Sequence, residues 1–550
     1  MTDLECYCYA VGHGDEGVCL AIVAGGYRIL LDCGIDDISP LLDMPVDAVI
    51  CTHAHPDHAK GLQAFQKACP DVPIYTSEVT ALLLPVQWLG GDRFPSVNPV
   101  SWRSPTEILP GLTLQLWPAG HLPGAACLLL THDAPHRRQT VFYTGDCMLS
   151  HSRLVEGMPL DELQGIKPDV LIVDGSYGVE RHARRKQQDN QLADTILRAI
   201  AQRYSIVLPT SRLGQGQELL MLLRSHHHFT GKDVDIWVSP GIAAGCDAYL
   251  ELLPYFPASV QNFAQHQPLF WDDRIRPWVH RLPTEHDGEW LAPSTTLDSS
   301  TTITTSTQAT ILVTEPNVLL EDCCADRQSR WMILLPQESN HMVVGQTISA
   351  QIQASPSLQA KLDAGTLELA SYELGEHCDG PALMQLIHSI RPQHVIFVHG
   401  SPHFLADLAN QDELQTRYQL HLPTAGTRIE LPIGDRFIQP APPVVRYEGE
   451  LSVLPTTVLL SLDSTIQDDV RWQKLADTGL IEAQWQGNDL LIRGVQVNNL
   501  LRGVQRDRPF PVERCASCLY CREQRCWNKA SPLFGFRVTP DGSCPAFEPV

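Results

Sequence analysis

The sequence lacks any apolar run approaching the ~18–20 residues that a membrane-spanning helix requires, which excludes an integral helical membrane protein. Its amino terminus, MTDLECYCYAVGHGDEG, carries acidic residues where a secretion signal needs basic ones, and no long apolar segment follows. We therefore expect a cytoplasmic protein that makes no contact with a membrane.

Positive charge is also scarce. The chain holds 40 lysine and arginine residues against 63 aspartate and glutamate residues, and its formal net charge is −23. This balance disfavours a protein that coats nucleic acid without specificity, because the phosphate backbone attracts basic surfaces. It is compatible with an enzyme that has a local basic cleft, and with metal sites whose carboxylates are offset by bound cations.

A disulfide framework is not indicated either. The 17 cysteines are scattered mostly singly over the first 400 residues, which is typical of reduced thiols. Hydrophobic content of 43% and charged content of 19% are ordinary for a globular protein. A chain of 550 residues exceeds one typical hydrophobic core, so we expect two to four domains.

One short stretch concentrates potential metal ligands. CTHAHPDHAKG (51–61) follows the apolar run VDAVI and brings His53, His55, Asp57 and His58 within six positions. Neutral imidazoles and carboxylates are the usual ligands of Zn²⁺ and similar divalent ions in hydrolases. A polar loop with surface histidines is the alternative, but four ligands directly after a buried strand favour a metal centre. The surrounding alternation of apolar strands and helical segments predicts a layered α/β structure.

The H-x-H-x-D-H pattern is the signature of the metallo-β-lactamase superfamily, and the chain resembles that family in the order of its later motifs. GHLPGA supplies His121 where the family has its third histidine, and YTGD supplies Asp146 where it has a bridging carboxylate. The resemblance implies an αβ/βα sandwich with two divalent metal ions, expected to be zinc, with manganese as the alternative. One ion would be held by His53, His55 and His121, and Asp146 would be shared.

The second ion would be held by Asp57, His58 and a histidine from late in the chain. Two ions that share a hydroxide suit phosphodiesters, but the same pair also cleaves lactams, thioesters and lactones. The metal centre therefore predicts a hydrolase and leaves its substrate open.

The late histidine follows only after a long insertion, between VDGSYGVERHARR and YELGEHCD. This layout resembles the β-CASP branch of the superfamily, the nucleic-acid-processing group that includes the cleavage and polyadenylation endonuclease and ribonuclease J. Three residues match its motifs: Asp174 in DGSYG, His377 in GEHCD and His399 in VIFVHG. Within the insertion, LPTSRLGQGQELL is similar to the family's strand-to-helix entry. The resemblance covers roughly residues 5–436.

The resemblance implies a role for each matched residue. His399 would complete the second metal group, and it favours RNA over DNA, because RNA-directed members carry histidine there where DNA-repair members tend to carry valine. His377 would contact the scissile phosphate and protonate the leaving oxygen, with Asp174 orienting it. Asp57 belongs to both the metal and the catalytic set. The alternatives are a satisfied polar residue at a strand end for His377 and a turn or helix cap for Asp174.

The expected phosphate-binding elements depart from the family pattern. ILVTEPNVLLEDCC replaces a glycine-rich element, with Thr314 in place of serine and with Glu315 and Asp322 adding negative charge. Lost glycines remove backbone amides that cradle phosphate, and acidic residues repel an RNA backbone. RHARRK (181–186) offers basic residues near the predicted site, although such a run is usually a solvated helix face. We predict an altered substrate groove, with three candidate contacts: Thr314, Arg181 and Arg184.

The carboxyl-terminal tail supplies a second set of candidate ligands. They come from CASCLYCREQRC and a later CPAF, and are Cys515, Cys518, Cys521, Cys526 and Cys544. Paired C-x-x-C spacings let thiolates converge on one ion, which predicts a structural zinc. An iron–sulfur cluster and unligated thiols are the alternatives. Such a module is suited to contact a protein partner or RNA.

These observations predict five segments. They are the first part of a metallo-β-lactamase domain (1–178), an inserted α/β β-CASP-like domain (179–373), the second part of the first domain (374–436), a small α/β or linker unit (437–505) and a Cys-rich module (506–550). The predicted function is a two-metal phosphodiester hydrolase, a ribonuclease in RNA processing that uses a metal-bridged hydroxide. A small-molecule metallo-hydrolase and a non-catalytic scaffold in an RNA-processing complex are the alternatives. No metal ligand is missing, which disfavours the scaffold.

Overall fold

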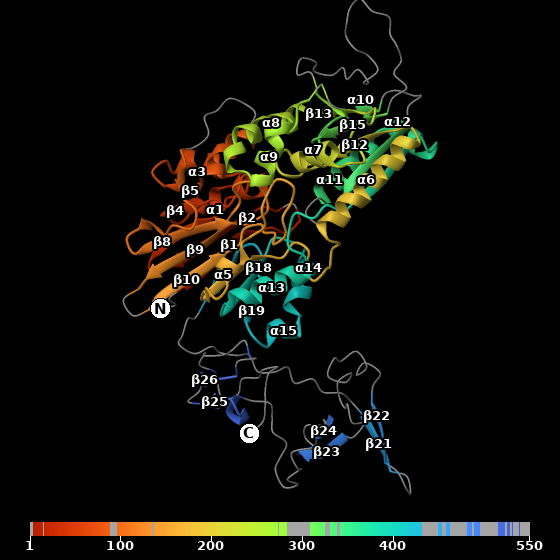
Figure 1. Ribbon diagram of the computed structural model, residues 1–550. Coiled ribbons are helices and arrows are strands. Elements are labelled where there is room, and N and C mark those ends of the chain that lie inside the picture. Colours follow the sequence, from red (N-terminus) through yellow and green to blue (C-terminus); the bar gives the residue numbers. More distant parts are fainter. Residues whose placement is uncertain are drawn as a thin grey trace, which may run out of the picture. The chain divides into compact units, whose positions relative to one another are not determined.

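The computed structural model of the chain is shown in Figure 1. It describes residues 4–14, 16–87, 96–134, 137–272, 274, 276–282, 309–324, 330–337, 342–431, 449–453, 458–462, 481–486, 489–494, 515–522, 525–528, 531 and 538. The predicted ligand Cys544 lies outside these residues. The chain divides into two compact units, 1–434 and 435–550, and each is described by itself. Among the described helices, none has the length and apolar character needed to cross a bilayer.

The first unit contains two seven-stranded sheets that face each other. The strand order of the first is β20-β1-β2-β3-β4-β5-β6, antiparallel from β20 to β3 and parallel from β3 to β6. Its strands are β1 (Leu4–Val11), β2 (Val18–Ala24), β3 (Tyr27–Leu31), β4 (Ala48–Ile50), β5 (Ile74–Ser77), β6 (Asn98–Val100) and β20 (Thr427–Glu430). The hairpin of β2 and β3 turns at Gly25 and Gly26, both at positive φ, as the Gly-Gly signal predicts.

The second sheet has the order β19-β18-β11-β10-β9-β8-β7, antiparallel from β7 to β10 and parallel from β10 to β19. Its strands are β7 (Thr106–Leu109), β8 (Leu112–Pro118), β9 (Ala126–Asp133), β10 (Arg138–Tyr143), β11 (Val170–Asp174), β18 (His394–Val398) and β19 (Gln419–His421). Side chains from both sheets, such as Leu20, Ile22, Leu128 and Ile172, form one buried cluster between them. Burial of these inner faces is what holds the two sheets together.

Helices cover the outer faces of both sheets (Figure 1). They are α1 (Ser39–Leu42), α2 (Pro56–Ala59), α3 (Leu62–Ala68), α4 (Glu78–Leu83) with the 3₁₀ turn η1 (Leu84–Gln87), α5 (Leu160–Leu163), α13 (Gly380–Ile390), α14 (Pro402–Ala409) and α15 (Asp412–Gln415). Helix α13 buries Leu383, Leu386 and Ile387, spaced three and four residues apart, as an amphipathic helix requires. The order helix, sheet, sheet, helix confirms the predicted αβ/βα sandwich.

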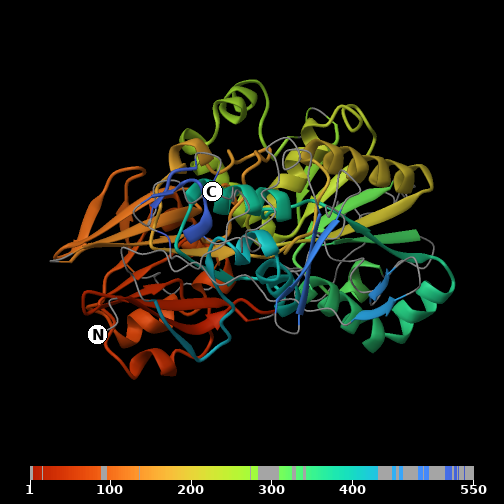
Figure 2. The ribbon, with the colours of Figure 1, turned by 90° about the horizontal axis from the view of Figure 1, so that it is seen from below.

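A third sheet, of six parallel strands, lies within the predicted insertion and on one side of the sandwich (Figure 2). Its order is β14-β13-β15-β12-β16-β17. The strands are β12 (Tyr204–Pro209), β13 (Asp235–Val238), β14 (Trp278–Arg281), β15 (Thr310–Thr314), β16 (Arg330–Pro336) and β17 (Leu367–Tyr372). The central strands YSIVLP and TILVT are buried at every position, which is typical of a parallel sheet covered on both faces.

The helices of this third sheet alternate with its strands. They are α6 (Arg185–Ala201), α7 (Gln215–Ser225), α8 (Pro240–Glu251) with the 3₁₀ turn η2 (Leu253–Tyr255), α9 (Ala258–His266), α10 (Leu320–Cys323), α11 (Met342–Ala354) and α12 (Pro356–Asp363). Ligands of such sheets bind beyond the carboxyl ends of the strands. The loops after β12 and β17 lead from those ends to the site described below.

The second unit contains three small hairpins. They are formed by β21 (Gly449–Val453) with β22 (Val458–Leu462), by β23 (Ile481–Gln486) with β24 (Asp489–Gly494), and by β25 (Cys521–Arg522) with β26 (Arg525–Cys526), the last preceded by the 3₁₀ turn η5 (Cys515–Ser517). We expected a small α/β or linker unit at 437–505; its residues 463–480 lie outside the described residues.

Candidate metal centre

The early histidine turn is built from a strand end and a helix start. Strand β4 ends at Ile50, His53 and His55 follow in the loop, and α2 begins at Pro56, whose ring suits the first helical position. Asp57 and His58 therefore lie on the first helical turn. A Cβ atom at Gly34 would lie 1.6 Å from the Asp57 carbonyl oxygen, so only glycine permits this close packing beneath the turn.

The other predicted ligands come from neighbouring strand ends of the second sheet. His121 follows β8, Asp146 follows β10 and His399 follows β18. Because β10 and β18 run parallel to each other through β11, their carboxyl ends meet at one edge of the sheet. His399 adopts a left-handed φ of 56°, which turns the chain sharply at the strand end and is uncommon for a residue with a side chain.

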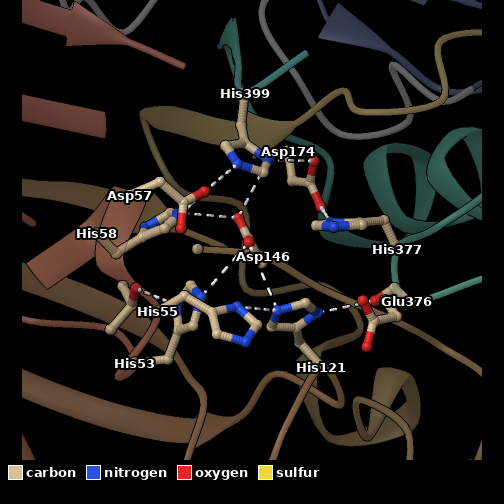
Figure 3. Close-up of polar contacts among 12 residues, drawn as sticks. His53, His55, Asp57, His58, His121, Asp146, Asp174, Glu376, His377 and His399 are labelled. Atoms are coloured by element: carbon tan, nitrogen blue, oxygen red, sulfur yellow. Dashed lines mark hydrogen bonds and ion pairs between the residues drawn. The ribbon is translucent and has the colours of Figure 1, made fainter. Parts of the chain in front are cut away.

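The seven predicted metal ligands lie together in two adjacent groups (Figure 3). One group is His53, His55, His121 and Asp146; the other is Asp57, His58, Asp146 and His399. Within each group the ligand atoms lie within 4.8 Å of one another. A third group of the same compactness joins Asp146 and His399 to the predicted catalytic residues, Asp174 and His377.

The distances assign each carboxylate oxygen of Asp146 to a different group. Oδ2 lies 3.4 Å from Nε2 of His53, and Oδ1 lies 3.1 Å from Nε2 of His58. Nδ1 of His55 lies 3.0 Å from Nε2 of His121, and Nε2 of His399 lies 3.1 Å from Oδ2 of Asp57. Asp146 thus stands between the two groups, as a bridging carboxylate does.

The residues fit divalent metal ions. Nε2 of His53, Nε2 of His58 and Oδ1 of Asp146 are buried and have no hydrogen-bond partner, although they lie close to one another. Leaving a buried polar atom unsatisfied costs about 1–3 kcal/mol, so a cluster of three indicates atoms arranged for another partner. Imidazole nitrogens and carboxylate oxygens are the donor set that Zn²⁺ and similar ions accept.

Asp32 orients two of the metal-group histidines. It is fully buried at a left-handed φ of 59°, and its Oδ2 accepts hydrogen bonds from Nδ1 of His58 and the hydroxyl of Tyr143, both at 2.8 Å. The Thr52 hydroxyl donates to Asp32 at 2.9 Å and so accepts from Nδ1 of His53 at 3.0 Å. In both histidines Nδ1 donates to this network, so Nε2 is the nitrogen that faces the metal groups.

Asp174 plays the same part on the opposite side of the site. Its Oδ1 accepts a hydrogen bond from the Ser176 hydroxyl at 2.5 Å, and that hydroxyl accepts from Nδ1 of His399 at 2.9 Å. Its Oδ2 lies 2.8 Å from Nδ1 of His377. One carboxylate thus orients a predicted metal ligand and the predicted proton donor together.

Backbone carbonyls hold the remaining two histidines. Nδ1 of His121 donates to the carbonyl of Glu376 at 2.9 Å, next to His377 in the chain. Nε2 of His55 donates to the carbonyl of Leu213 at 3.1 Å, which lies in the loop between β12 and α7. The inserted sheet therefore takes part in orienting a metal-group histidine.

Burial and the neighbouring charges shift the pKa values of the metal-group residues in both directions. Burial and, to a smaller extent, the imidazole of His58 lower the pKa of His53 to about 4, although Asp146 raises it. Burial would raise the pKa of Asp146, but the surrounding histidines hold it well below its usual range. Burial would lower the pKa of His399, but Asp146 and other carboxylates raise it to about 10. A bound cation must therefore displace a proton from His399.

His377 is buried beside Asp174, with exposed fractions of 7% and 2%. Burial alone would lower the pKa of His377, but the Asp174 carboxylate outweighs it, so that the pKa lies above its usual value. The ring centroid of His377 lies 4.8 Å from that of His121 and 5.4 Å from that of His399. The imidazole therefore lies against both metal groups (Figure 3).

The predicted substrate contacts lie apart from these groups. Thr314 ends β15, is 1% exposed, and donates its hydroxyl to the Glu315 carbonyl at 3.4 Å. Arg181 and Arg184 have exposed side chains just before α6. All three stay predictions as substrate contacts. The neighbouring Arg185, which sequence reasoning did not single out, donates to the Gly375 carbonyl at 2.8 Å.

The negative charge that we expected from Glu315 is offset. The Arg212 guanidinium donates to its Oε1 at 2.8 and 2.9 Å, and both side chains are about one-fifth exposed. Arg212 also donates to the carbonyls of Val86 and Gln87 in the sandwich. Glu315 thus belongs to a link between the inserted sheet and the sandwich. The side chain of Asp322 lies outside the described residues.

Sequence reasoning missed three polar residues of the site: Asp32, Thr52 and Ser176. Asp32 had a signal, because a carboxylate directly follows the apolar strand YRILL. Thr52 and Ser176 each adjoin a predicted site motif, but short hydroxyl residues are common in turns and carry little information by themselves.

Comparison with known proteins agrees with this geometry. Residues 27–202 match a beta-lactamase superfamily domain, and residues 367–422 match a Zn-dependent metallo-hydrolase RNA specificity domain. The chain is 43% identical to an uncharacterized protein of Synechocystis sp. over 98% of its own length and 96% of that protein's. It is 27% identical to a probable RNase of Methanocaldococcus jannaschii over 38% of the chain and 54% of the relative.

A further relative is the Integrator complex subunit 11 homolog of Dictyostelium discoideum, at 22% identity over 75% of the chain and 59% of the relative. The chain therefore spans little more than half the length of these last two proteins. Similarity over nearly the full length of the Synechocystis protein, two matching family domains and the ordered ligand motifs confirm the predicted resemblance. The chain belongs to the metallo-β-lactamase superfamily, in its β-CASP branch, and is a metal-dependent hydrolase.

Proposed function

We propose that the chain is a two-metal phosphodiesterase that cleaves RNA. The observation that carries this proposal is the pairing of the two ligand groups through Asp146, with the Asp174–His377 pair against both. His53, His55 and His121 would hold one ion, and Asp57, His58 and His399 the other. Such ions supply a nucleophile from water at neutral pH and neutralise the charge that develops on a phosphodiester.

The residues of the chain perform the remaining steps. Asp174 accepts from Nδ1 of His377, which fixes the ring and leaves Nε2 as the nitrogen that can face a substrate. A protonated His377 would donate a hydrogen bond to the scissile phosphate and then its proton to the leaving oxygen. Because Asp174 also fixes His399 through Ser176, the proton donor and the second metal group keep a constant separation. Asp57, which closes the second group, would keep the attacking water next to the phosphate.

RNA as the substrate is supported by two observations. The matched RNA specificity domain, 367–422, contains both His377 and His399. One relative is named a probable RNase. In addition, the Arg212 guanidinium offsets the negative charge of Glu315, which we expected near the substrate groove. We also propose that zinc is the metal in both groups and that the protein acts in the cytoplasm. The domain boundaries given in the sequence analysis are part of the same proposal.

The test uses labelled RNA, DNA of the same sequence and a small chromogenic phosphodiester. Purified chain is treated with a chelator and then supplied with zinc or manganese. We expect metal-dependent cleavage of RNA, lost in His55→Ala and strongly reduced in His377→Ala with unchanged metal content. His403→Ala is the matched control, because its side chain on α14 is 81% exposed and pairs with Asp407 of the same helix. If only the small diester is cleaved, the substrate is a small molecule and not RNA. If none of the three substrates is hydrolysed, the proposal is refuted.

A further inference from the structure

A second cluster of metal-binding side chains lies in the carboxyl-terminal unit, outside the hydrolytic site. Cys515 begins the 3₁₀ turn η5, and two backbone hydrogen bonds follow in sequence: the amide of Cys518 donates to the carbonyl of Cys515 at 3.2 Å, and the amide of Cys521 donates to that of Cys518 at 3.1 Å. Cys521 then pairs directly with Cys526 across the hairpin of β25 and β26. Consecutive turns and a hairpin thus bring four thiols, spaced C-x₂-C-x₂-C-x₄-C, into one small segment.

Thiols make up most of the buried apolar side chains in this segment, among the described residues. Cys515, Cys518 and Cys526 are 6%, 9% and 7% exposed, and Cys521 is partly buried against a cluster of Cys515, Cys526 and Val538. Among the described residues from 515 to 538, Val538 is the sole other buried apolar side chain. The pKa of Cys521 is raised by burial and by the nearby thiols of Cys518 and Cys526. None of these four cysteines forms a disulfide.

The described residues of this segment bury little apolar surface besides their thiols. Full burial of one valine contributes only about 1.5–3 kcal/mol, whereas ordering each residue costs about 1–2 kcal/mol. Small modules of this kind are usually held by disulfides or by a structural metal. Buried thiols that form no disulfide, at C-x₂-C spacings on consecutive turns and a hairpin, are suited to bind a structural metal.

We propose that Cys515, Cys518, Cys521 and Cys526 bind one structural Zn²⁺ ion as thiolates. At the histidine site, ligand atoms from three or more residues lie within 4.8 Å of one another. Among the described residues of this segment, no three sulfur atoms lie that close together. We therefore expect the ion to draw the four sulfur atoms together, so that binding and folding of the segment are coupled. Each thiol that becomes a ligand releases its proton to solvent.

The experiment measures thiolate-bound zinc in the full-length protein. An organomercurial reagent, which captures thiolates and displaces their metal, is titrated into purified protein that contains a chromogenic zinc chelator. We expect one equivalent of zinc to be released from the wild type and from His55→Ala, and none from the double variant Cys518→Ser/Cys526→Ser. Cys69→Ser, which removes a partly exposed thiol after α3, is the control and should match the wild type.

Elemental analysis of the same preparations completes the test. The double variant should contain one zinc equivalent less than the wild type, whatever metal the histidine site holds. The wild-type titration gives the answer even if the double variant fails to fold. Equal zinc release with and without the cysteines would overturn the proposal, as would iron with acid-labile sulfide and a visible absorption band, which would instead identify an iron–sulfur cluster. Because the readout is thiolate zinc, failure here is distinct from failure of RNA cleavage.

Discussion

Replacing Asp32 by asparagine should weaken metal binding although Asp32 is not itself a ligand. Its Oδ1 accepts from the amide of Thr52 at 2.7 Å, so the single oxygen of an asparagine would stay at that position. The new amide group would then face Nδ1 of His58 and the hydroxyl of Tyr143, where Oδ2 accepted both. Because an amide N–H donates, Nδ1 of His58 would have to accept, and the ring proton would move to Nε2. A protonated Nε2 cannot bind a metal ion.

The size of the effect follows from the two lost hydrogen bonds. A hydrogen bond to a charged group contributes about 1.5–3 kcal/mol. Loss of an orienting partner of this kind typically lowers metal affinity about 10–100-fold, or about 1.4–2.7 kcal/mol. We expect a loss in that range for Asp32→Asn, measured by competition with a chelator of known affinity at constant pH.

Tyr143→Phe is the matched control for this prediction. It removes one donor to Asp32 and leaves the carboxylate and its hydrogen bond to His58 in place. Its metal affinity should stay within about threefold of the wild type, a shift of less than 1 kcal/mol. Equal affinities for Asp32→Asn and the wild type, with both folded, would show that the carboxylate does not set the orientation of His58.

Three further predictions concern other parts of the site. The Asp174 carboxylate raises the pKa of His377, although burial lowers it. Activity that needs protonated His377 is therefore complete at low pH and is lost as the pH rises through that pKa. In Asp174→Asn this pKa falls, so the alkaline limb of the kcat profile should move to lower pH. Arg185→Met removes a guanidinium, 10% exposed, that donates to the Gly375 carbonyl and to Glu218; it should destabilise the fold by about 3 kcal/mol, measured by denaturant unfolding, while metal content is retained. Metal removal should lower Tm, and titration of zinc back into weakly buffered protein should release protons, including one from His399; a constant pH would contradict the role given to that residue.

Much of the metal centre was predictable because its chemistry is local. His53, His55, Asp57 and His58 lie within six residues, and a strand end followed by a proline-started helix is enough to bring them into one turn. His121, Asp146 and His399 are distant in the chain and were predicted from the order of family motifs. The fold class followed in the same way, from strand and helix alternation together with that order.

The surroundings of the ligands were less predictable because they depend on contacts between distant segments. Arg212 and Glu315 are 103 residues apart, and the sequence showed only the unpaired charge of Glu315.

The sequence by itself determined which atoms are available to bind metal, because ligand chemistry belongs to residue type and the early turn is set by local backbone preferences. The tertiary structure alone decided which nitrogen of each histidine faces the metal groups. That choice depends on a partner for the other ring nitrogen, and the partners of His55 and His121 are backbone carbonyls at Leu213 and Glu376. Every residue carries a carbonyl, so residue identity cannot indicate which one the fold will bring to a given histidine.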